Sequence, residues 1–544
     1  MRSEHRTPAP AALRLGWLLL VLACLAGLAL GGCASLPPSA ARTESHALAD
    51  TGDTALARGL AGELAAHPGK SGIHPLQNAE DAFAARILLA RQAQRSLDLQ
   101  YYIWHGDTTG QLMFEAVWQA AERGVRVRLL LDDANTGGLD PLLAALDAHP
   151  NIEVRLFNPF ANRGFRVGDF ALDFSRVNRR MHNKSFTADN QASIVGGRNI
   201  GDEYFGANME VGFQDLDVLA VGPVVREVSD EFDLFWNSAS AYPASALLPK
   251  AGADSAAMLR ARWARVRENP QAQGYIEAVR GTPLVREIGQ GSVPYEWTQA
   301  RVLHDDPAKV LEPTDRSDLQ MLPQLLARMG QPKRELDLVS PYFVPGTGGT
   351  DDLVRLARSG VKVQVLTNSL AATDVAPVHA GYSKYREALL RGGVTVYELK
   401  PGLAVAPPER NANRDDEKDG PRARIPGSGG SQASSAASLH AKTFAVDEQR
   451  IFVGSFNLDP RSSRLNTEMG VLIESPELAG QLGRMFDTRI PLDAYQVTLA
   501  PNGSLVWIER GPQGETRIDS EPGAQPMKRF YLGILELLPI EWML

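Results

Sequence analysis

Two segments far apart in the chain carry the same spaced set of polar residues. In each segment a histidine is followed two positions later by a lysine and five positions after that by an aspartate. The two sets are His182, Lys184 and Asp189, and His440, Lys442 and Asp447. One such set on the solvent-exposed face of a strand is common, whereas two copies with identical spacing indicate a repeated unit. We therefore expect two related halves.

The repetition extends beyond these two motifs. Downstream, Gly196-Gly197-Arg198-Asn199 corresponds to Gly454-Ser455-Phe456-Asn457, and upstream, Leu97-Asp98-Leu99 corresponds to Leu336-Asp337-Leu338. The long distance between the copies predicts two homologous lobes and is unlike the short period of a solenoid.

Each lobe is predicted to be an α/β unit. In the first half a helix starts near Asn78, a strand covers 97–104, a helix covers 110–123 and an apolar strand covers 125–131. Strand, helix and strand of these lengths are typical of a parallel crossover. The predicted fold class is α/β: two homologous lobes, each a mixed β-sheet flanked by helices, with one active site shared at their interface.

The chain has 544 residues, which is more than one ordinary hydrophobic core organises, so we expect two domains with short additional segments. Residues 34–75 are rich in Ala, Gly, Pro and Ser and are predicted to be a flexible tether. The predicted order is a lipoprotein signal peptide (1–33), the tether (34–75), the first lobe (76–250), an inter-lobe connection (251–319), the second lobe (320–491, with a flexible insertion at 406–438) and a C-terminal extension (492–544).

The first 33 residues are typical of an export signal. Arg2, Arg6 and Arg14 precede an apolar run over 15–30, which ends before a cysteine and polar sequence. Small residues directly before Cys33 resemble a bacterial lipobox, which implies lipidation of Cys33 and attachment to a membrane through a lipid anchor. A plain transmembrane anchor is the alternative, since about 16 apolar residues approach the length of a span.

The same resemblance implies a location in the bacterial cell envelope, facing the periplasm. Ala34 follows the cysteine, where an aspartate often retains such proteins at the inner membrane. The outer membrane is therefore favoured over the inner membrane.

Net charge and cysteine content exclude other classes. The formal net charge is -8 and the pI is about 5.8, so a nucleic-acid partner is not expected. The only cysteines, Cys24 and Cys33, lie in the N-terminal segment, which excludes thiol catalysis in the body of the protein.

Two histidines and two lysines are suited to displacement at a phosphodiester. One neutral imidazole can attack phosphorus to form a phosphohistidine while the other, protonated, gives its proton to the leaving alcohol. Lys184 and Lys442, with Asn199 and Asn457, are predicted to hold the non-bridging oxygens. Neither a metal nor another cofactor is expected.

Each imidazole also needs a carboxylate that orients it. Alignment of the strands that follow each motif pairs Asp215 with Glu468, and these two are the predicted orienting residues. Asp189 and Asp447 are predicted to belong to the catalytic set, with the alternative that they fix the turn after each strand.

The paired motifs resemble the HKD motifs of the phospholipase D superfamily, and the resemblance covers roughly residues 76–491. In two-motif members the first histidine is usually the nucleophile and the second the acid, which implies these roles for His182 and His440. Ser455 stands where the family often has a phosphate-binding serine or threonine, whereas the first lobe has Gly197. This departure puts one phosphate contact in doubt.

Within the superfamily the chain is most similar to bacterial cardiolipin synthases of the C type. The resemblance is carried by residues 97–104, 198–205, 367–374, 379–382 and 538–542. It implies transfer of a phosphatidyl group from phosphatidylethanolamine to the alcohol of phosphatidylglycerol. A phospholipase D hydrolase, a nuclease and a non-catalytic envelope lipid-binding protein are the alternatives, and the need for a protein partner stays open.

Overall fold

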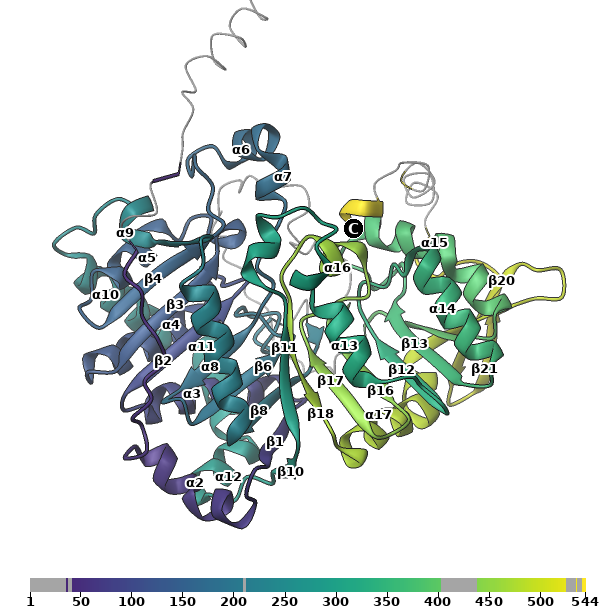
Figure 1. Cartoon of the computed structure of the whole chain (residues 1–544), viewed down its shortest axis with the longest axis horizontal. Coiled ribbons are helices and arrows are strands. Elements are labelled where there is room, and N and C mark those ends of the chain that lie inside the picture. The colour runs from purple at the N-terminus through teal and green to yellow at the C-terminus, as the bar shows by residue number, and fades with distance from the viewer. Residues whose placement is uncertain (1–35, 38–41, 209–211, 403–437, 525–534, 536–540) are drawn as a thin grey trace, which may run out of the picture.

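Two large sheets repeat one strand order in the computed structural model, which describes residues 36–37, 42–208, 212–402, 438–524, 535 and 541–544 (Figure 1). The first sheet has nine strands in the order β10-β1-β8-β6-β5-β2-β3-β4-β9. The second has ten, in the order β11-β18-β17-β16-β12-β13-β14-β19-β20-β21. The run from β8 to β9 in the first sheet matches the run from β18 to β19 in the second.

The strands have the following bounds. In the first sheet they are β1 (Ser71–Leu76), β2 (Ser96–Tyr101), β3 (Arg126–Asp132), β4 (Ile152–Phe157), β5 (Ser185–Ala188), β6 (Ala192–Gly196), β8 (Asp217–Val221), β9 (Ala241–Pro243) and β10 (Glu296–Thr298). In the second they are β11 (Ala300–His304), β12 (Glu335–Val339), β13 (Lys362–Asn368), β14 (Thr395–Leu399), β16 (Thr443–Val446), β17 (Arg450–Gly454), β18 (Met469–Ile473), β19 (Ala494–Leu499), β20 (Leu505–Gly511) and β21 (Gly514–Ile518). A third, two-stranded sheet pairs β7 (Phe213–Gln214) with β15 (Ser438–Leu439).

Helices flank both sheets (Figure 1). Those of the first half are α2 (Ala55–Ala66), α3 (Ala79–Gln92), α4 (Thr108–Glu122), η2 (Asp133–Asn135), α5 (Asp140–Asp147), α6 (Arg166–Leu172), α7 (Phe174–Val177), α8 (Pro223–Trp236), α9 (Ala244–Leu247), α10 (Ser255–Glu268), α11 (Pro270–Arg280) and α12 (Pro283–Gln290). Those of the second half are η3 (Pro307–Val310), η4 (Ser317–Leu319), α13 (Met321–Met329), α14 (Gly346–Arg358), α15 (Ala376–Arg391), α16 (Pro460–Arg464), α17 (Pro476–Thr488), α18 (Ile490–Asp493) and η5 (Glu541–Met543).

The predicted α/β fold class with two related lobes is confirmed. The strand predicted over 97–104 is β2, the helix predicted over 110–123 is α4, and the strand predicted over 125–131 is β3. β2 pairs in parallel with β3, and β12 pairs in parallel with β13 at the matching place. β2 and β3 are buried along nearly their whole length. This is expected for parallel strands whose sheet has helices on both faces.

The two lobes share a buried apolar cluster where their sheets meet. Val195 and Val218 of the first sheet pack with Val453 and Val471 of the second in this cluster. β6 therefore lies against β17 and β18. The ends of these strands, and the motifs beside them, are brought to one interface.

The predicted boundaries need three corrections. The tether at 34–75 is wrong from residue 42 onward, because α2 and β1 are regular elements and β1 pairs with β8 and β10. The connection at 251–319 does run from one lobe to the other, but its elements belong to the lobes, because α10–α12 and β10 pack on the first lobe and β11 joins the second sheet. The extension at 492–544 contributes β19, β20 and β21 to the second sheet.

Composition misled these predictions because it ignores pairing partners that are distant in the sequence. The predicted signal peptide, with Cys33, and the predicted insertion apart from Ser438 lie outside the described residues. Within the part of the chain that is described, we find no helix with the length and apolar character needed to span a bilayer.

Candidate active site

Each motif begins at the start of a two-stranded hairpin. β5 and β6 form the first hairpin and β16 and β17 the second, and each joins its sheet beside the central strand β2 or β12. The two residues at each tip, Asp189-Asn190 and Asp447-Glu448, have φ between 51 and 53°. Positive φ at both central positions is typical of a tight hairpin turn that matches the twist of its strands.

The two motif aspartates act at the hairpin tips, away from the histidines. The carboxylate of Asp189 accepts hydrogen bonds from the amides of Gln94, Arg95 and Ser96 at 2.7–3.1 Å. Asp447 likewise accepts from the three amides of residues 333–335. The four-residue strands between lysine and aspartate separate these carboxylates from the imidazoles. Their place in the catalytic set is therefore corrected to the structural alternative.

The first histidine is held by the second lobe. The amide of His182 donates to the carbonyl of Thr467 at 2.8 Å, and Met181 forms a parallel bridge with Thr467. Because Glu468 follows, its Oε2 lies 2.8 Å from Nδ1 of His182, with the carbonyl oxygen of Ser455 3.1 Å from the same nitrogen. Two acceptors at Nδ1 favour a proton there and leave the lone pair of Nε2 free.

The second histidine is held by the first lobe in the same way. β15 pairs in parallel with β7, and the amide of His440 donates to the carbonyl of Gln214 at 2.8 Å. Asp215 follows, and its Oδ2 lies 2.5 Å from Nδ1 of His440. The structure thus brings each predicted orienting carboxylate to an imidazole. The crossed arrangement, in which each lobe orients the other lobe's histidine, was not predicted.

Both motif lysines are almost fully buried among these groups. Nζ of Lys184 donates to the carbonyl of His182 at 2.5 Å, and Nζ of Lys442 donates to the carbonyl of His440. Nζ of Lys442 also lies 3.0 Å from Nδ1 of His440. Two ammonium groups are thereby placed beside two imidazoles in a site that excludes most water.

Burial and like charge set the protonation of the cationic groups. Burial lowers the pKa of Lys184 to about 7 and that of Lys442 to about 8. Burial and then both lysines hold the pKa of His182 well below its ordinary value. Since lysines from both motifs act on one imidazole, the two motifs share a single electrostatic environment.

The second half-site differs in charge from the first. Burial and then Lys442 lower the pKa of His440 to about 4, although Asp215 opposes this shift. Burial alone would raise the pKa of Asp215, but His440 and the nearby cations hold it below its ordinary value. Burial raises the pKa of Glu468 to about 7. An ionised carboxylate therefore faces His440, which makes that imidazole the easier of the two to protonate.

The difference between Gly197 and Ser455 follows from these carboxylates. A side-chain carbon at Gly197 would lie 2.1 Å from Oδ1 of Asp215, so this position has no room for a side chain. At the matching position, Oγ of Ser455 donates to Oε2 of Glu468 at 2.5 Å. The predicted phosphate-binding Ser455 is engaged with the orienting carboxylate.

The two predicted phosphate-binding asparagines are both buried at the site. Oδ1 of Asn199 accepts a hydrogen bond from the amide of Ile103 at 3.1 Å. Oδ1 of Asn457 has no hydrogen-bond partner among the described residues. Nδ2 of Asn199 likewise has no hydrogen-bond partner among the described residues. Asn199 therefore supports the loop after β2 through its oxygen, and each asparagine has one side-chain atom without a partner in the site.

One matched pair of residues was missed by sequence reasoning. Asp132, at the end of β3, accepts a hydrogen bond from the amide of Met181 at 2.8 Å. Asn368, at the end of β13, accepts one from the amide of Leu439 at 3.0 Å. Each acceptor fixes the residue directly before a motif histidine. The signal was present in the repeat, because both residues stand eight positions after the matched Gly124 and Gly360.

Aromatic rings line the remaining faces of the imidazoles. The ring of Tyr102 stands edge-on to His182 at 5.0 Å between centroids, and that of Tyr204 stands edge-on to His440 at 5.3 Å. Phe213 lies 5.0 Å from His440. These contacts limit ring rotation and exclude water from the site.

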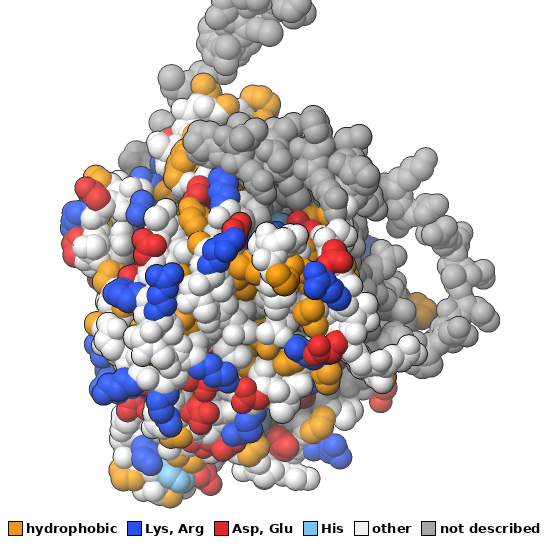
Figure 2. Space-filling model, turned by 90° about the vertical axis from the view of Figure 1, so that its right-hand side faces the viewer, with side chains coloured by type: hydrophobic (Ala, Val, Ile, Leu, Met, Phe, Trp, Pro, Cys, Tyr) orange, Lys and Arg blue, Asp and Glu red, His pale blue; other side chains and the backbone are white. Residues whose placement is uncertain are grey.

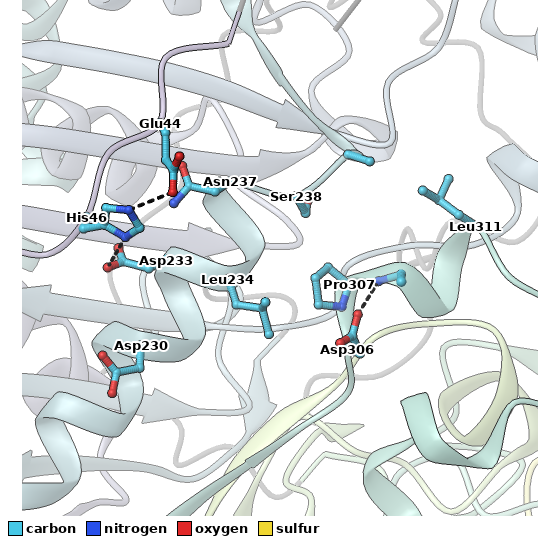
Figure 3. Close-up of a pocket in the computed structure, with 12 residues that line it drawn as sticks. Glu44, His46, Asp230, Asp233, Leu234, Asn237, Ser238, Asp306, Pro307 and Leu311 are labelled. Atoms are coloured by element: carbon cyan, nitrogen blue, oxygen red, sulfur yellow. Dashed lines mark hydrogen bonds and ion pairs between the residues drawn. The ribbon is translucent and has the colours of Figure 1, made fainter.

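A separate groove of about 580 Å³ lies between α8 and η3 and is lined by none of the motif residues (Figure 3). Figure 3 shows His46 between Glu44 and Asp233, with nitrogen to oxygen distances of 3.0 and 3.4 Å. The amide of Ala47 also donates to Asp233. At this groove the N-terminal segment binds to α8, and the motif histidines and lysines lie outside it.

Comparison with known proteins agrees with this geometry. A family model described as "Cardiolipin synthase, PLD-like domain" matches residues 87–236 and 325–490. The chain is 46% identical over 481 residues to cardiolipin synthase C of Escherichia coli (strain K12), which covers 88% of this chain and 97% of that protein. It is 25% identical to the major cardiolipin synthase of Bacillus subtilis (strain 168), over 76% of this chain and 67% of that protein.

Among solved structures, phosphatidylserine synthase of Haemophilus influenzae Rd KW20 matches 79% of this chain and 90% of its own, with 15% identity and a TM-score of 0.49. The family model covers both lobes and both histidine motifs, and the relative from Escherichia coli covers nearly the whole chain. The chain belongs to the cardiolipin synthase family of phospholipase D-like proteins.

Proposed function

We propose that this protein is a phosphatidyltransferase that makes cardiolipin through a phosphohistidine. The observation that carries the proposal is the crossed pair of hydrogen bonds, His182 with Glu468 and His440 with Asp215. These bonds aim two imidazoles from different lobes into one lysine-lined site. Such a site supports displacement at a phosphodiester, and the family membership supports a phospholipid as its substrate.

In the first half-reaction Nε2 of His182 attacks the phosphorus of phosphatidylethanolamine. The bond from phosphorus to the ethanolamine oxygen breaks, and Nε2 of His440 gives its proton to that oxygen. Ethanolamine leaves and a phosphatidyl group stays on His182. The ionised Asp215 supports the protonated state of His440, while the lower pKa of His182 keeps the nucleophile neutral.

In the second half-reaction a hydroxyl of phosphatidylglycerol attacks the same phosphorus. His440, now neutral, takes the hydroxyl proton, the bond from nitrogen to phosphorus breaks, and His182 is released with cardiolipin as product. Lys184 and Lys442 offset the charge on the non-bridging oxygens in both steps. A cation stabilises such a charge more strongly in a site that excludes water.

A hydrolase is the second candidate because it uses the same residues. Water would then resolve the phosphohistidine and release phosphatidic acid. A nuclease is disfavoured by charge: on the face of the second lobe shown in Figure 2, basic and acidic side chains are interspersed, and the whole chain carries a net charge of -8.

We also propose attachment to the bacterial envelope through acylation of Cys33, facing the periplasm and on the outer membrane. The support is the arginine-led apolar run that ends in small residues before Cys33. Metabolic labelling with a radioactive fatty acid tests this proposal. Label on the wild-type chain and none on Cys33→Ser would support it, and equal labelling of both chains would contradict it.

The activity is tested by incubating the full chain with phosphatidylethanolamine and phosphatidylglycerol, each carrying a different label, in mixed micelles. Cardiolipin that carries both labels, and that is lost in His182→Ala and in His440→Ala, is the expected result. Phosphatidic acid without cardiolipin would establish the hydrolase. No lipid product at all would overturn a role in phospholipid transfer.

A further inference from the structure

One end of the molecule exposes apolar side chains that have no cover in the described structure. Phe165 is 63% exposed and Leu172 75%, at the two ends of α6. Val167 on the same helix is 42% exposed, and Trp542 of η5 is 55% exposed. We call these four residues the apolar ridge. In Figure 1, α6 and α7 project at the top of the first lobe, with η5 opposite them beside the C-terminus.

The ridge is continuous across the two lobes. The ring of Phe174 on α7 stands edge-on to Trp542 at 6.2 Å between centroids, and edge-on to Phe170 at 5.0 Å. Arg461 of α16 donates to the carbonyl of Met543 at 2.8 Å. Its guanidinium also donates to the carbonyl and side-chain oxygens of Asn178 at 3.0 Å. One arginine thus links both sides of the ridge.

The ridge lies close to the first motif along the chain. α7 ends at Val177, five positions before His182, and Asn178 lies between them. On the other side, Leu544 packs with Val344 and with Val378, which lies at the start of α15. The ridge therefore borders the segment that leads into the first half-site.

The charge around the ridge is close to balanced. Residues 158–180 contain five arginines and two aspartates. Arg163, Arg166 and Arg180 pair with carboxylates of residues 132, 133 and 140, and Arg176 pairs with Asp173. Exposed apolar side chains that are rimmed by polar groups are typical of a surface that contacts another molecule or a membrane, and the phospholipid substrate favours a membrane here.

The N-terminal part of the described chain enters at the same end of the first lobe. Arg42 donates to the carbonyl of Ser238, and its guanidinium stacks on Tyr242 of β9 at 4.4 Å. β9 pairs with the end of β4, and the chain runs from β4 directly into the segment that carries α6. A membrane anchor in residues 1–33 would thus hold the molecule with the ridge toward the bilayer.

We propose that the apolar ridge inserts into the surface of a phospholipid bilayer and holds the segment that leads to His182 against the lipid. The inference rests on the proposed function, because a phospholipid substrate must leave the bilayer to reach the histidines. Beyond that function, it identifies the surface and the residues that contact the bilayer.

Lipid contact can be measured on the full chain with a single fluorescent label. Cys24 and Cys33 are the only cysteines, so their replacement by serine leaves a background in which one new cysteine is labelled. Leu172→Cys and Trp542→Cys report on the ridge. Met258→Cys on α10 and Leu326→Cys on α13 are matched controls, since these side chains are 69% and 62% exposed and lie away from α6.

Each labelled chain is added to vesicles of phosphatidylethanolamine and phosphatidylglycerol that contain a quencher on the acyl chains. We expect several-fold stronger quenching at positions 172 and 542 than at 258 and 326. Equal quenching at all four positions would overturn the proposal. So would a spectral shift at 172 that rises with protein concentration without vesicles, because a second copy of the chain would then cover the ridge.

Activity separates the ridge from the chemistry. The double variant Phe165→Asp, Leu172→Asp is compared with the control Met258→Asp, Leu326→Asp. On vesicles the ridge variant should lose at least tenfold in rate, and on short-chain phospholipids dissolved as monomers it should match the control. Equal rates of both variants on vesicles would overturn the ridge. Absence of cardiolipin with wild-type chain on either substrate would instead overturn the proposed function.

Discussion

At the scale of single residues, the protonation of the site depends on which carboxylate faces which imidazole. Asp215 and Glu468 occupy matching positions in the two lobes. Asp215, beside His440, is ionised, whereas burial raises the pKa of Glu468, beside His182, to about 7. The two half-sites are therefore suited to different tasks, nucleophile in the first and acid in the second.

Replacement of Asp215 by asparagine keeps the shape and removes the charge. The expected loss in kcat is on the order of 10²–10⁴, by analogy with the orienting aspartate of other histidine-based enzymes. Asp215 raises the pKa of His440 in the folded protein, so the variant should need a lower pH to keep His440 protonated. The falling limb of the plot of kcat against pH should move to lower pH, whereas an unmoved limb would exclude His440 as the acid.

The hairpin aspartates should affect stability and leave the chemistry intact. Asp189→Ala removes the acceptor for three backbone amides, one of them fully buried, and should lower the free energy of unfolding by about 1.5–3 kcal/mol. Denaturant unfolding followed by fluorescence measures this loss. The kcat of the folded variant should stay within about threefold of wild type, and a loss as large as that of His182→Ala would restore a catalytic role.

Asp447 makes a parallel prediction about pH. Backbone hydrogen bonds from residues 333–335 outweigh the effect of burial and lower its pKa. A carboxyl with a lowered folded-state pKa stabilises the fold above its ordinary pKa, and this contribution is lost as pH falls through the folded value. The difference in unfolding free energy between wild type and Asp447→Asn should shrink below about pH 4. A constant difference down to pH 2 would contradict this.

At the scale of elements, the repeat predicted more than the composition did. Alignment of the strands that follow each motif predicted Asp215 and Glu468 as partners of the histidines, and the strand-helix-strand pattern predicted β2, α4 and β3. The crossed pairing could not be predicted, because β15 with β7 and Met181 with Thr467 join segments separated by more than 200 residues. α2 and β1 were missed because small residues and Pro75 masked a strand whose partners lie far along the chain.

The strand-end acceptors Asp132 and Asn368 belong to this scale because they position whole motif strands. Asn368→Ala should lower kcat about tenfold with little change in KM, since the lost hydrogen bond frees the backbone before His440. Asn368→Asp, which copies Asp132, keeps an acceptor and should retain more activity than the alanine variant. If both variants have equal kcat, Asn368 only stabilises the fold.

At the scale of the whole molecule, two lobes supply one half-site each and neither is complete alone. The cations that stabilise the negative charge on the phosphoryl oxygens are expected to be Lys184 and Lys442, which both lie in the buried site. Activity should therefore persist in excess chelator, as measured by cardiolipin formation after dialysis. Loss of activity with recovery on addition of a divalent cation would contradict this scheme.

The central claim is that His182 and His440 serve one centre in the roles of nucleophile and acid. Rapid acid-free quenching of the wild-type chain with phosphatidylethanolamine labelled at phosphorus, followed by peptide mapping, tests it most directly. The account predicts label on the peptide that contains His182, and loss of that label into cardiolipin when phosphatidylglycerol is added. Label on the His440 peptide, or cardiolipin formed with no labelled peptide at any time, would contradict it.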